Sequence, residues 1–348
     1  MSIKNWNAGI IRPVAVAPAG PYQDGAAPGV WTLDQAAFWQ KQGLWPIAGN
    51  FSRGLFGGGT ISSGNTNVVQ YISIPTLGNA TDFGDLTLAR YYLSACASTT
   101  RGLFAGGYTT GSAPVNVIDR VTIATAGNAA DFGDLTQLTR VLAACSSTTR
   151  GVFAGGQSPD ITTRTNVISY VTIASAGNAI DFGDLLALTD FIAGCSSPTR
   201  GIFAGGFIST GQTNVIQYIT IASTGNAADF GDLTQARQNL VGCSSSTRGI
   251  FAGGNLNPTK VNTIDYITIA SLGNATDFGD LLAIIDSQAA CSSPTRGVFG
   301  GGSDSSGIRL NVIQYVTIAS VGNSADFGDL LAGTASLAGC SNTDGGLQ

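Results

Sequence analysis

The chain of 348 residues contains no histidine and no glutamate, and its only methionine is the first residue. Without histidine, neither a Ser/His/Asp nor a Cys/His catalytic set can exist. Charged residues make up 11% of the chain, well below the roughly 25% typical of soluble domains. Nucleic-acid binding needs clustered Lys and Arg, whereas the net charge is −5 and Lys260 is the only lysine past residue 50. We expect no catalytic residues, no metal, no cofactor and no nucleic-acid partner.

Long apolar runs are also missing. No stretch approaches the roughly 18 apolar residues of a membrane span. The N-terminus lacks the apolar core of a signal peptide, because Lys4, Asn5, Asn7 and Arg12 interrupt it. We therefore expect neither membrane insertion nor a secretory route.

What the chain does contain is one unit of about 49 residues, repeated six times. Its cysteines mark the period, at intervals of 49, 50, 48, 48 and 49 residues: Cys96, Cys145, Cys195, Cys243, Cys291 and Cys340. A period near 50 with a Gly-Gly pair in each copy predicts four-stranded blades repeated around an axis. Equivalent positions are held apart by symmetry, so we expect six buried thiols. Disulfides are the alternative that an even cysteine count allows.

Each repeat divides into four strand-like segments, which in the fifth copy are 240–245, 248–254, 263–271 and a short one around 277–281. The first clear strand of the chain, 53–59, is of the second kind, and the last, 337–341, is of the first kind. We therefore predict an all-β, six-bladed propeller. Its C-terminal strand would complete the first blade and remove a free edge.

The order of segments resembles a kelch repeat, with Arg and small residues, an apolar strand that ends in Gly-Gly, and a strand with a tyrosine. The matching tyrosines are Tyr71, Tyr170, Tyr218, Tyr266 and Tyr315, while the second copy has Arg120. Phenylalanine replaces the family's closing tryptophan: Phe83, Phe132, Phe182, Phe230, Phe278 and Phe327. The resemblance implies a kelch-like propeller over about 300 residues and leaves function open.

Enzymes known on such propellers need residues that are missing here. Galactose oxidase binds copper partly through histidine. A sialidase needs an arginine triad, a tyrosine nucleophile and turns that end in tryptophan, and the repeats contain no tryptophan. We expect no enzymatic activity.

Asp-Phe-Gly-Asp occurs once in every repeat and accounts for twelve of the 21 aspartates. One interpretation is a calcium site in each blade. The favoured one is a structural turn in which Asp accepts backbone N–H bonds or pairs with the arginine that opens the second strand. These arginines also mark the repeats: Arg53, Arg101, Arg150, Arg200, Arg248 and Arg296. The aspartates of the four central copies are Asp131, Asp181, Asp229 and Asp277.

The copies differ mainly in two segments, the loop between the second and third strands and the connector that leads into the next repeat. In an up-and-down blade both lie on one face, and variable loops on a rigid scaffold often recognise ligands. The candidate contacts are Arg90, Tyr91, Tyr92, Tyr108, Arg164, Phe191, Phe207, Arg237 and Lys260. Drift in unconstrained loops is the alternative.

Residues 1–49 differ from the propeller region, 50–348. Thr32 and Gln35 form a capping box that predicts a short helix over about 33–42, followed by Gly43. Such a short helix needs a partner to be stable, so we expect this arm to anchor the protein. The candidate anchors are Trp6, Trp31, Phe38, Trp39 and Trp45.

The segment 27–46, which contains Gly29-Val-Trp-Thr-Leu33 and closes with Trp45-Pro46, resembles one found in structural proteins of tailed bacteriophages. The repeats are also similar to those of marine and cyanobacterial phage proteins. The resemblance implies a multicopy virion protein of a tail fibre, baseplate or capsid surface, assembled in the host cytoplasm. Its arm would bind other virion proteins, and its variable face a host-surface glycan or protein. A purely architectural cement protein and a cellular kelch-like scaffold are the alternatives.

Overall fold

The computed structural model describes residues 34, 52–111 and 113–343. Asp34 is helical. The rest of the predicted helix, the aromatic anchors of the arm and the predicted boundary after residue 49 lie outside these residues.

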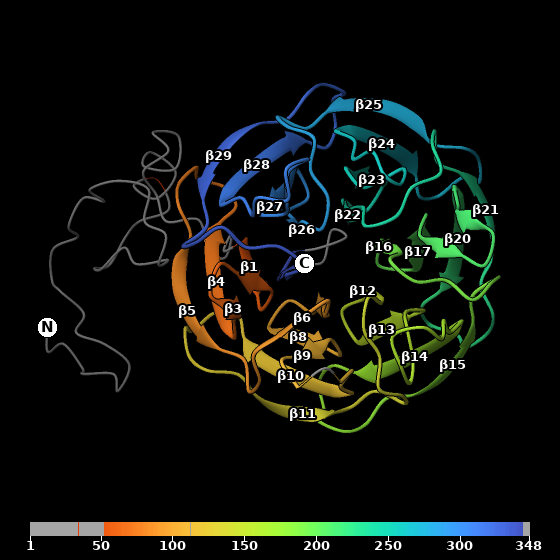
Figure 1. Cartoon of the computed structure of the whole chain (residues 1–348), viewed down its shortest axis with the longest axis horizontal. Coiled ribbons are helices and arrows are strands. Elements are labelled where there is room, and N and C mark those ends of the chain that lie inside the picture. Colours follow the sequence, from red (N-terminus) through yellow and green to blue (C-terminus); the bar gives the residue numbers. More distant parts are fainter. Residues whose placement is uncertain (1–33, 35–51, 112, 344–348) are drawn as a thin grey trace, which may run out of the picture. The chain divides into compact units, whose positions relative to one another are not determined.

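The described residues form six four-stranded antiparallel sheets, arranged as blades around a common axis (Figure 1). The prediction of an all-β, six-bladed propeller is therefore confirmed. In each blade the strands follow one another from the axis outward.

The innermost strands, in order from blade 1 to blade 6, are β30 (Ala338–Ser341), β7 (Ser94–Ala97), β12 (Ala143–Ser146), β16 (Ala193–Ser196), β22 (Val241–Ser244) and β26 (Ala289–Ser292). The second strands are β1 (Arg53–Gly57), β8 (Arg101–Ala105), β13 (Arg150–Ala154), β17 (Arg200–Ala204), β23 (Arg248–Ala252) and β27 (Arg296–Gly300). The third strands are β4 (Val68–Ser73), β10 (Val117–Thr122), β14 (Val167–Thr172), β20 (Val215–Thr220), β24 (Thr263–Thr268) and β28 (Val312–Thr317).

The outermost strands are β5 (Thr81–Asp85), β11 (Ala130–Asp134), β15 (Ile180–Asp184), β21 (Ala228–Asp232), β25 (Thr276–Asp280) and β29 (Ala325–Asp329). Short two-residue strands cap some blades: β2 (Thr60–Ile61), β3 (Gly64–Asn65), β6 (Arg90–Tyr91), β9 (Tyr108–Thr109), β18 (Phe207–Ile208) and β19 (Gly211–Gln212).

The ring closes within blade 1. The C-terminal strand β30 pairs with β1, from Gly54 opposite Ser341 to Gly57 opposite Ala338. This is the closure predicted from the order of strands, and it leaves no blade incomplete.

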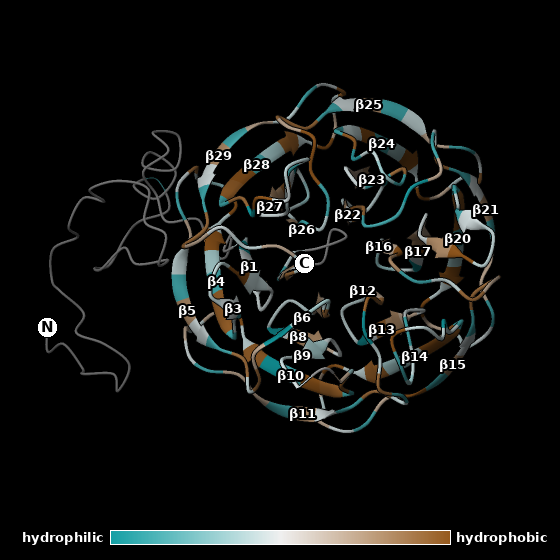
Figure 2. Ribbon diagram, in the orientation of Figure 1, coloured by the Kyte–Doolittle hydropathy of each residue, from teal (hydrophilic) through white to brown (hydrophobic). Residues whose placement is uncertain are grey.

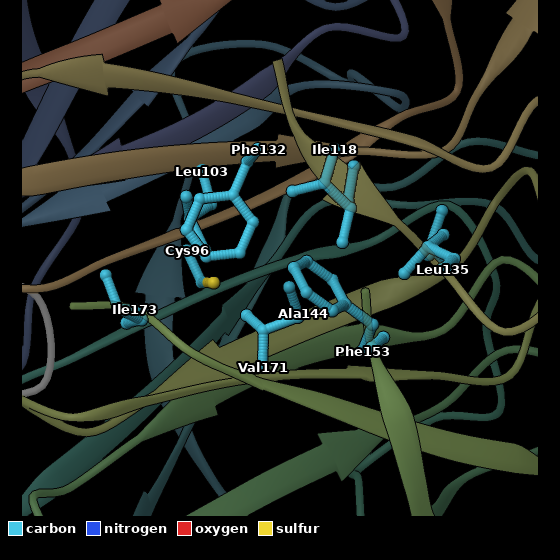
Figure 3. Packing of buried hydrophobic residues seen from close by; sticks show 12 residues of the cluster. Cys96, Leu103, Ile118, Phe132, Leu135, Ala144, Phe153, Val171 and Ile173 are labelled. Atoms are coloured by element: carbon cyan, nitrogen blue, oxygen red, sulfur yellow. The ribbon is translucent and has the colours of Figure 1, made fainter. Parts of the chain in front are cut away.

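The hydrophobic core lies between neighbouring blades. Leu103 and Phe132 of blade 2 pack with Phe153 and Val171 of blade 3 in one cluster (Figure 3). Equivalent clusters recur around the ring, because the second strands are almost entirely buried. The outermost strands are more hydrophilic, as β25 and β29 show in Figure 2.

The six cysteines are buried thiols, as predicted. Each one fills space left by a glycine of the following blade: a Cβ on Gly151 would lie 2.8 Å from Cys96 Sγ, and one on Gly249 would lie 3.0 Å from Cys195 Sγ. Burial raises the pKa of Cys195 to about 12. The Cys195 thiol therefore stays protonated at neutral pH, and the buried cysteines pack as small apolar residues.

The repeat arginines join each blade to the next. Arg53 Nη1 donates to Ile123 O in blade 2 at 2.9 Å, and Arg296 Nη1 closes the ring with Ile74 O in blade 1 at 2.9 Å. In five blades the guanidinium also lies over the repeat tyrosine, 4.4–4.9 Å from the ring centroid. None of the four ion pairs in the described residues joins a repeat arginine to a repeat aspartate. The expected pairing was wrong, because backbone carbonyls of the next blade lie within reach of the arginines.

The Asp-Phe-Gly-Asp strand is bound by the Gly-Asn-Ala turn of the following blade. Gly127 N donates to Phe83 O and Ala129 N to Asp85 O, both at 2.7 Å. Asn128 Oδ1 accepts a bond from Asp85 N at 3.1 Å. The two segments are nearly invariant because each is the partner of the other. These contacts use backbone atoms of the Asp-Phe-Gly-Asp strand, and nothing in the structure explains why its two aspartates recur in every repeat.

The glycine of this strand is required by the close approach of the next blade. Gly133 has φ 147°, and a Cβ there would lie 2.5 Å from Gly177 O. A Cβ on Gly127, in the same blade, would meet nothing within 4 Å. We expect Gly133→Ala to lower the free energy of unfolding by about 2–4 kcal/mol through strain and overpacking. Gly127→Ala should change it by less than about 1 kcal/mol. Chemical denaturation measures both, and equal effects would contradict the proposed interblade contact.

Candidate functional site

The loops between second and third strands and the connectors into the innermost strands lie side by side; we call this the variable face. Single β-bridges join the two segments, for example Arg140 with Gln157 and Asp190 with Phe207. The opposite face carries the nearly invariant turns, and we call it the uniform face. Sequence differences between the copies therefore concentrate on one side of the ring.

At the axis of the variable face, each connector contributes one residue in the left-handed backbone conformation. Their φ angles lie between 52 and 58°, and none of the six is glycine: Tyr92, Val141, Phe191, Asn239, Ser287 and Ser336. This conformation is uncommon for residues with a Cβ, and for a β-branched residue such as Val141 it is a genuine outlier.

A closed cycle of backbone hydrogen bonds holds these six residues, which we call the axial ring. Val141 N donates to Tyr92 O, Phe191 N to Val141 O, and so on until Tyr92 N donates to Ser336 O. The six N···O distances are 2.8–3.2 Å. Each strained residue is thus fixed by both neighbours.

The axial ring surrounds a cavity of about 80 Å³, which we call the axial cup. Below the ring, the cup is lined by the residue that directly follows each ring residue in the sequence: Leu93, Leu142, Ile192, Leu240, Gln288 and Leu337. These six residues also line the central channel beneath, whose volume is about 150 Å³. The cup is therefore the mouth of the channel.

The axial ring is chemically divided. Blades 2, 3 and 4 contribute Tyr92, Val141 and Phe191, with the Tyr92 and Phe191 rings edge-to-face at 5.7 Å. Blades 5, 6 and 1 contribute an amide and two hydroxyls. Burial raises the pKa of the Tyr92 phenol, opposed by a hydrogen bond with Ser336 and by the charge of Arg140. The cup thus has an apolar side and a polar side.

Further aromatic side chains extend the apolar side outward. Tyr91 packs edge-to-face on Tyr108, with centroids 5.6 Å apart. The Arg140 guanidinium lies 4.7 Å from the Tyr108 centroid and 5.7 Å from that of Tyr92. Arg140 is not among the candidate contacts drawn from the differences between the repeats, although it occupies the same connector as Val141.

Gln288 is a second departure from symmetry at the cup. The other five copies have leucine or isoleucine at this position. The Gln288 side chain is buried, and its Oε1 has no hydrogen-bond partner among the described residues. A buried unsatisfied oxygen costs about 1–3 kcal/mol.

Two candidate contact residues, Arg90 and Arg237, are fully buried and cannot touch a ligand on this face. Arg90 pairs with Asp119 at 3.2 Å, and Arg237 with Asp265 at 3.0 Å. Burial lowers the pKa of both guanidinium groups, and the partner carboxylates oppose this shift. The expectation that both arginines contact a ligand was wrong, because each compensates a buried carboxylate.

The sequence did carry a signal for these ion pairs. Arg in the connector coincides with Asp in the third strand in blades 2 and 5 only. Blades 1, 4 and 6 have glutamine in place of that Asp, and its Oε1 accepts a connector N–H at 2.8 Å: Gln70 from Leu331, Gln217 from Leu186, and Gln314 from Leu282. The same buried position therefore holds an Arg–Asp ion pair in two blades and a glutamine hydrogen bond in three, while blade 3 has Ser169 there.

The other charged candidates link neighbouring blades. Arg164 pairs with Asp190 at 3.1 Å, and its side chain is 24% exposed. Lys260 pairs with Asp286 at 2.9 Å and is 16% exposed. Burial raises the pKa of Asp190, opposed by Gln157 and Arg164. Phe207 lies under Arg164, 4.6 Å from its guanidinium carbon.

The candidate aromatic residues, by contrast, are half-buried on the variable face: Tyr91, Tyr92, Tyr108, Phe191 and Phe207. In the described part of the chain, no group of three His, Cys, Asp or Glu residues is placed to hold a metal ion. No helix within those residues is long and apolar enough to span a membrane.

The repeat provides a rescue test for the buried pair. Arg237→Thr leaves Asp265 buried without its cation and should reduce stability by about 3–5 kcal/mol. Adding Asp265→Gln recreates the Thr189 and Gln217 combination of blade 4 and should restore most of the loss. Urea denaturation of both variants measures this. A double variant as unstable as the single one would show that the Arg–Asp ion pair and the glutamine hydrogen bond are not interchangeable.

A scan against protein-family models finds no match, and a search of curated proteins also finds no match. Function is therefore inferred from the fold and from the geometry of the axial cup.

Proposed function

We propose that the protein is a non-enzymatic binding protein whose axial cup recognises a neutral, partly apolar ligand, such as a terminal sugar of a host-surface glycan. The observation that carries this proposal is the axial ring of six strained residues that keep their side chains. A propeller of this kind is compatible with either binding or scaffolding.

The strain is informative because, among the described residues outside the axial ring, Asn257 is the only non-glycine residue with a positive φ. At other repeated positions with positive φ, such as those of Gly58, Gly59 and Gly84, every copy has glycine. The axial ring has no glycine in any copy, although non-glycine residues in this conformation cost about 1–3 kcal/mol each. Such strain clusters at ligand-binding sites, and here it places six side chains of five kinds around one cavity.

The lining of the cup indicates the class of ligand. None of its twelve residues carries a formal charge at neutral pH, so an ionic ligand would lose hydration without gaining a partner. Tyr92 and Phe191 offer apolar surface, and Asn239, Ser287 and Ser336 offer hydrogen-bonding groups. A pyranose, which combines a C–H face with hydroxyls, complements both sides.

Phe191 tests the proposal directly. Phe191→Leu keeps apolar bulk but removes the aromatic face, and should weaken binding of a neutral host glycan about 5- to 10-fold. Phe207→Leu, on the same face but outside the cup lining, should leave binding unchanged. A glycan array followed by titration of the full chain measures both. Absence of binding to any host polysaccharide would favour the architectural cement role instead.

The resemblance of the N-terminal segment to tailed-phage structural proteins supports a place on a virion. There, the arm would attach the protein to other virion proteins, and multiple copies would strengthen weak glycan contacts by avidity.

Deletion of residues 1–45 should abolish incorporation into particles while the circular dichroism and the melting transition of the β-structure persist. Immunoblotting of purified particles measures incorporation. Normal incorporation of the deleted protein would disprove the anchor role, and loss of the β-structure would show that the arm serves folding.

A further inference from the structure

One blade departs from the arginine–tyrosine contact that holds the others. In five blades the repeat arginine lies over a tyrosine, and that tyrosine packs edge-to-face on the repeat phenylalanine at 5.7–6.1 Å. Blade 2 has Arg120 in place of the tyrosine. Its repeat arginine, Arg101, is therefore beside a second cation.

The strand register places the two arginines next to each other. In blade 3, Val152 is opposite Tyr170, and Arg150 lies two residues before Val152 with its guanidinium carbon 4.6 Å from the tyrosine ring centroid. In blade 2, Leu103 is opposite Arg120, and Arg101 lies two residues before Leu103. Arg120 therefore occupies the position of the tyrosine over which the repeat arginine lies in the other blades.

Among the described residues, no carboxylate forms an ion pair with either arginine of this pair. Arg101 Nη1 is bound to Ile173 O at 2.9 Å and Ala174 O at 2.6 Å, both neutral carbonyls. Arg120 Nε is buried without a hydrogen-bond partner among the described residues.

We propose that Arg101 and Arg120 form a binding site for an oxyanion, a sulfate or phosphate group. Guanidinium groups offer paired N–H donors that match the oxygens of these anions. An anion between two adjacent guanidinium groups would offset their mutual repulsion and supply the missing acceptor for Arg120. This site is outside the axial cup, so it does not depend on the proposed glycan recognition.

The other blades supply the decisive variant. Arg120→Tyr recreates the arrangement of the remaining blades, so it should fold and should melt at a higher temperature than the unmodified chain in chloride buffer. Sodium sulfate or phosphate, compared with chloride at equal ionic strength, should raise the melting temperature of the unmodified chain by about 2 °C or more. It should have no such specific effect on Arg120→Tyr.

A gain-of-site variant provides the matched control. Tyr170→Arg places a second arginine beside Arg150 in blade 3 and should increase the sulfate-specific shift. Equal stabilisation of the unmodified chain and Arg120→Tyr by sulfate, or no difference between sulfate and chloride, would overturn the proposal. Isothermal titration with inorganic sulfate, inorganic phosphate and a sulfated disaccharide distinguishes a free anion from a sulfate ester of a glycan.

Discussion

Each outermost strand leaves backbone groups unpaired at its edge, and the Gly-Asn-Ala turn of the following blade satisfies them. The contact between Asp85 and Asn128 recurs between Asp329 and Asn79, where blade 6 meets blade 1. The repeat arginines reinforce it from the uniform face. Because the same contacts are made at every junction, six copies close into a ring, and the residues that make them can vary little. Glycine at the closest approach follows from the same constraint, since any side chain there would meet backbone.

This repeated scaffold allows the variable face to hold backbone that would be unstable alone. Left-handed conformations at Val141 and Phe191 persist only where the surrounding structure over-determines them. Here the cycle of hydrogen bonds does so, with each connector fixed by the connectors on both sides. The side chains above that cycle are free to differ, because the bonds use backbone atoms only. A symmetric frame thereby supports an asymmetric cup with one aromatic side and one polar side.

Differences between the copies have two physical origins, and a single copy does not distinguish them. Arg90 and Tyr91 are neighbours in one connector, yet the first is fully buried against Asp119 and the second is half-buried on the surface. Pairs of positions that change together, such as Arg237 with Asp265, identify buried compensation. Positions that change alone, such as those of the axial ring, carry side chains that are not matched to a partner that changes with them. Variability alone therefore does not distinguish a ligand-binding surface from buried compensation.

The sequence by itself determined the number of blades, the order of strands, the closure by the C-terminal strand and the burial of the cysteines. These properties follow from period and local polarity, which a linear pattern encodes directly. Only the tertiary structure decided the partners of the repeat arginines, the burial of Arg90 and Arg237, and the axial ring. Arg53 reaches Ile123, 70 residues away, and the axial ring joins residues from all six repeats. Such contacts depend on which backbone atoms a neighbouring blade brings within hydrogen-bonding distance, and no local pattern specifies that distance.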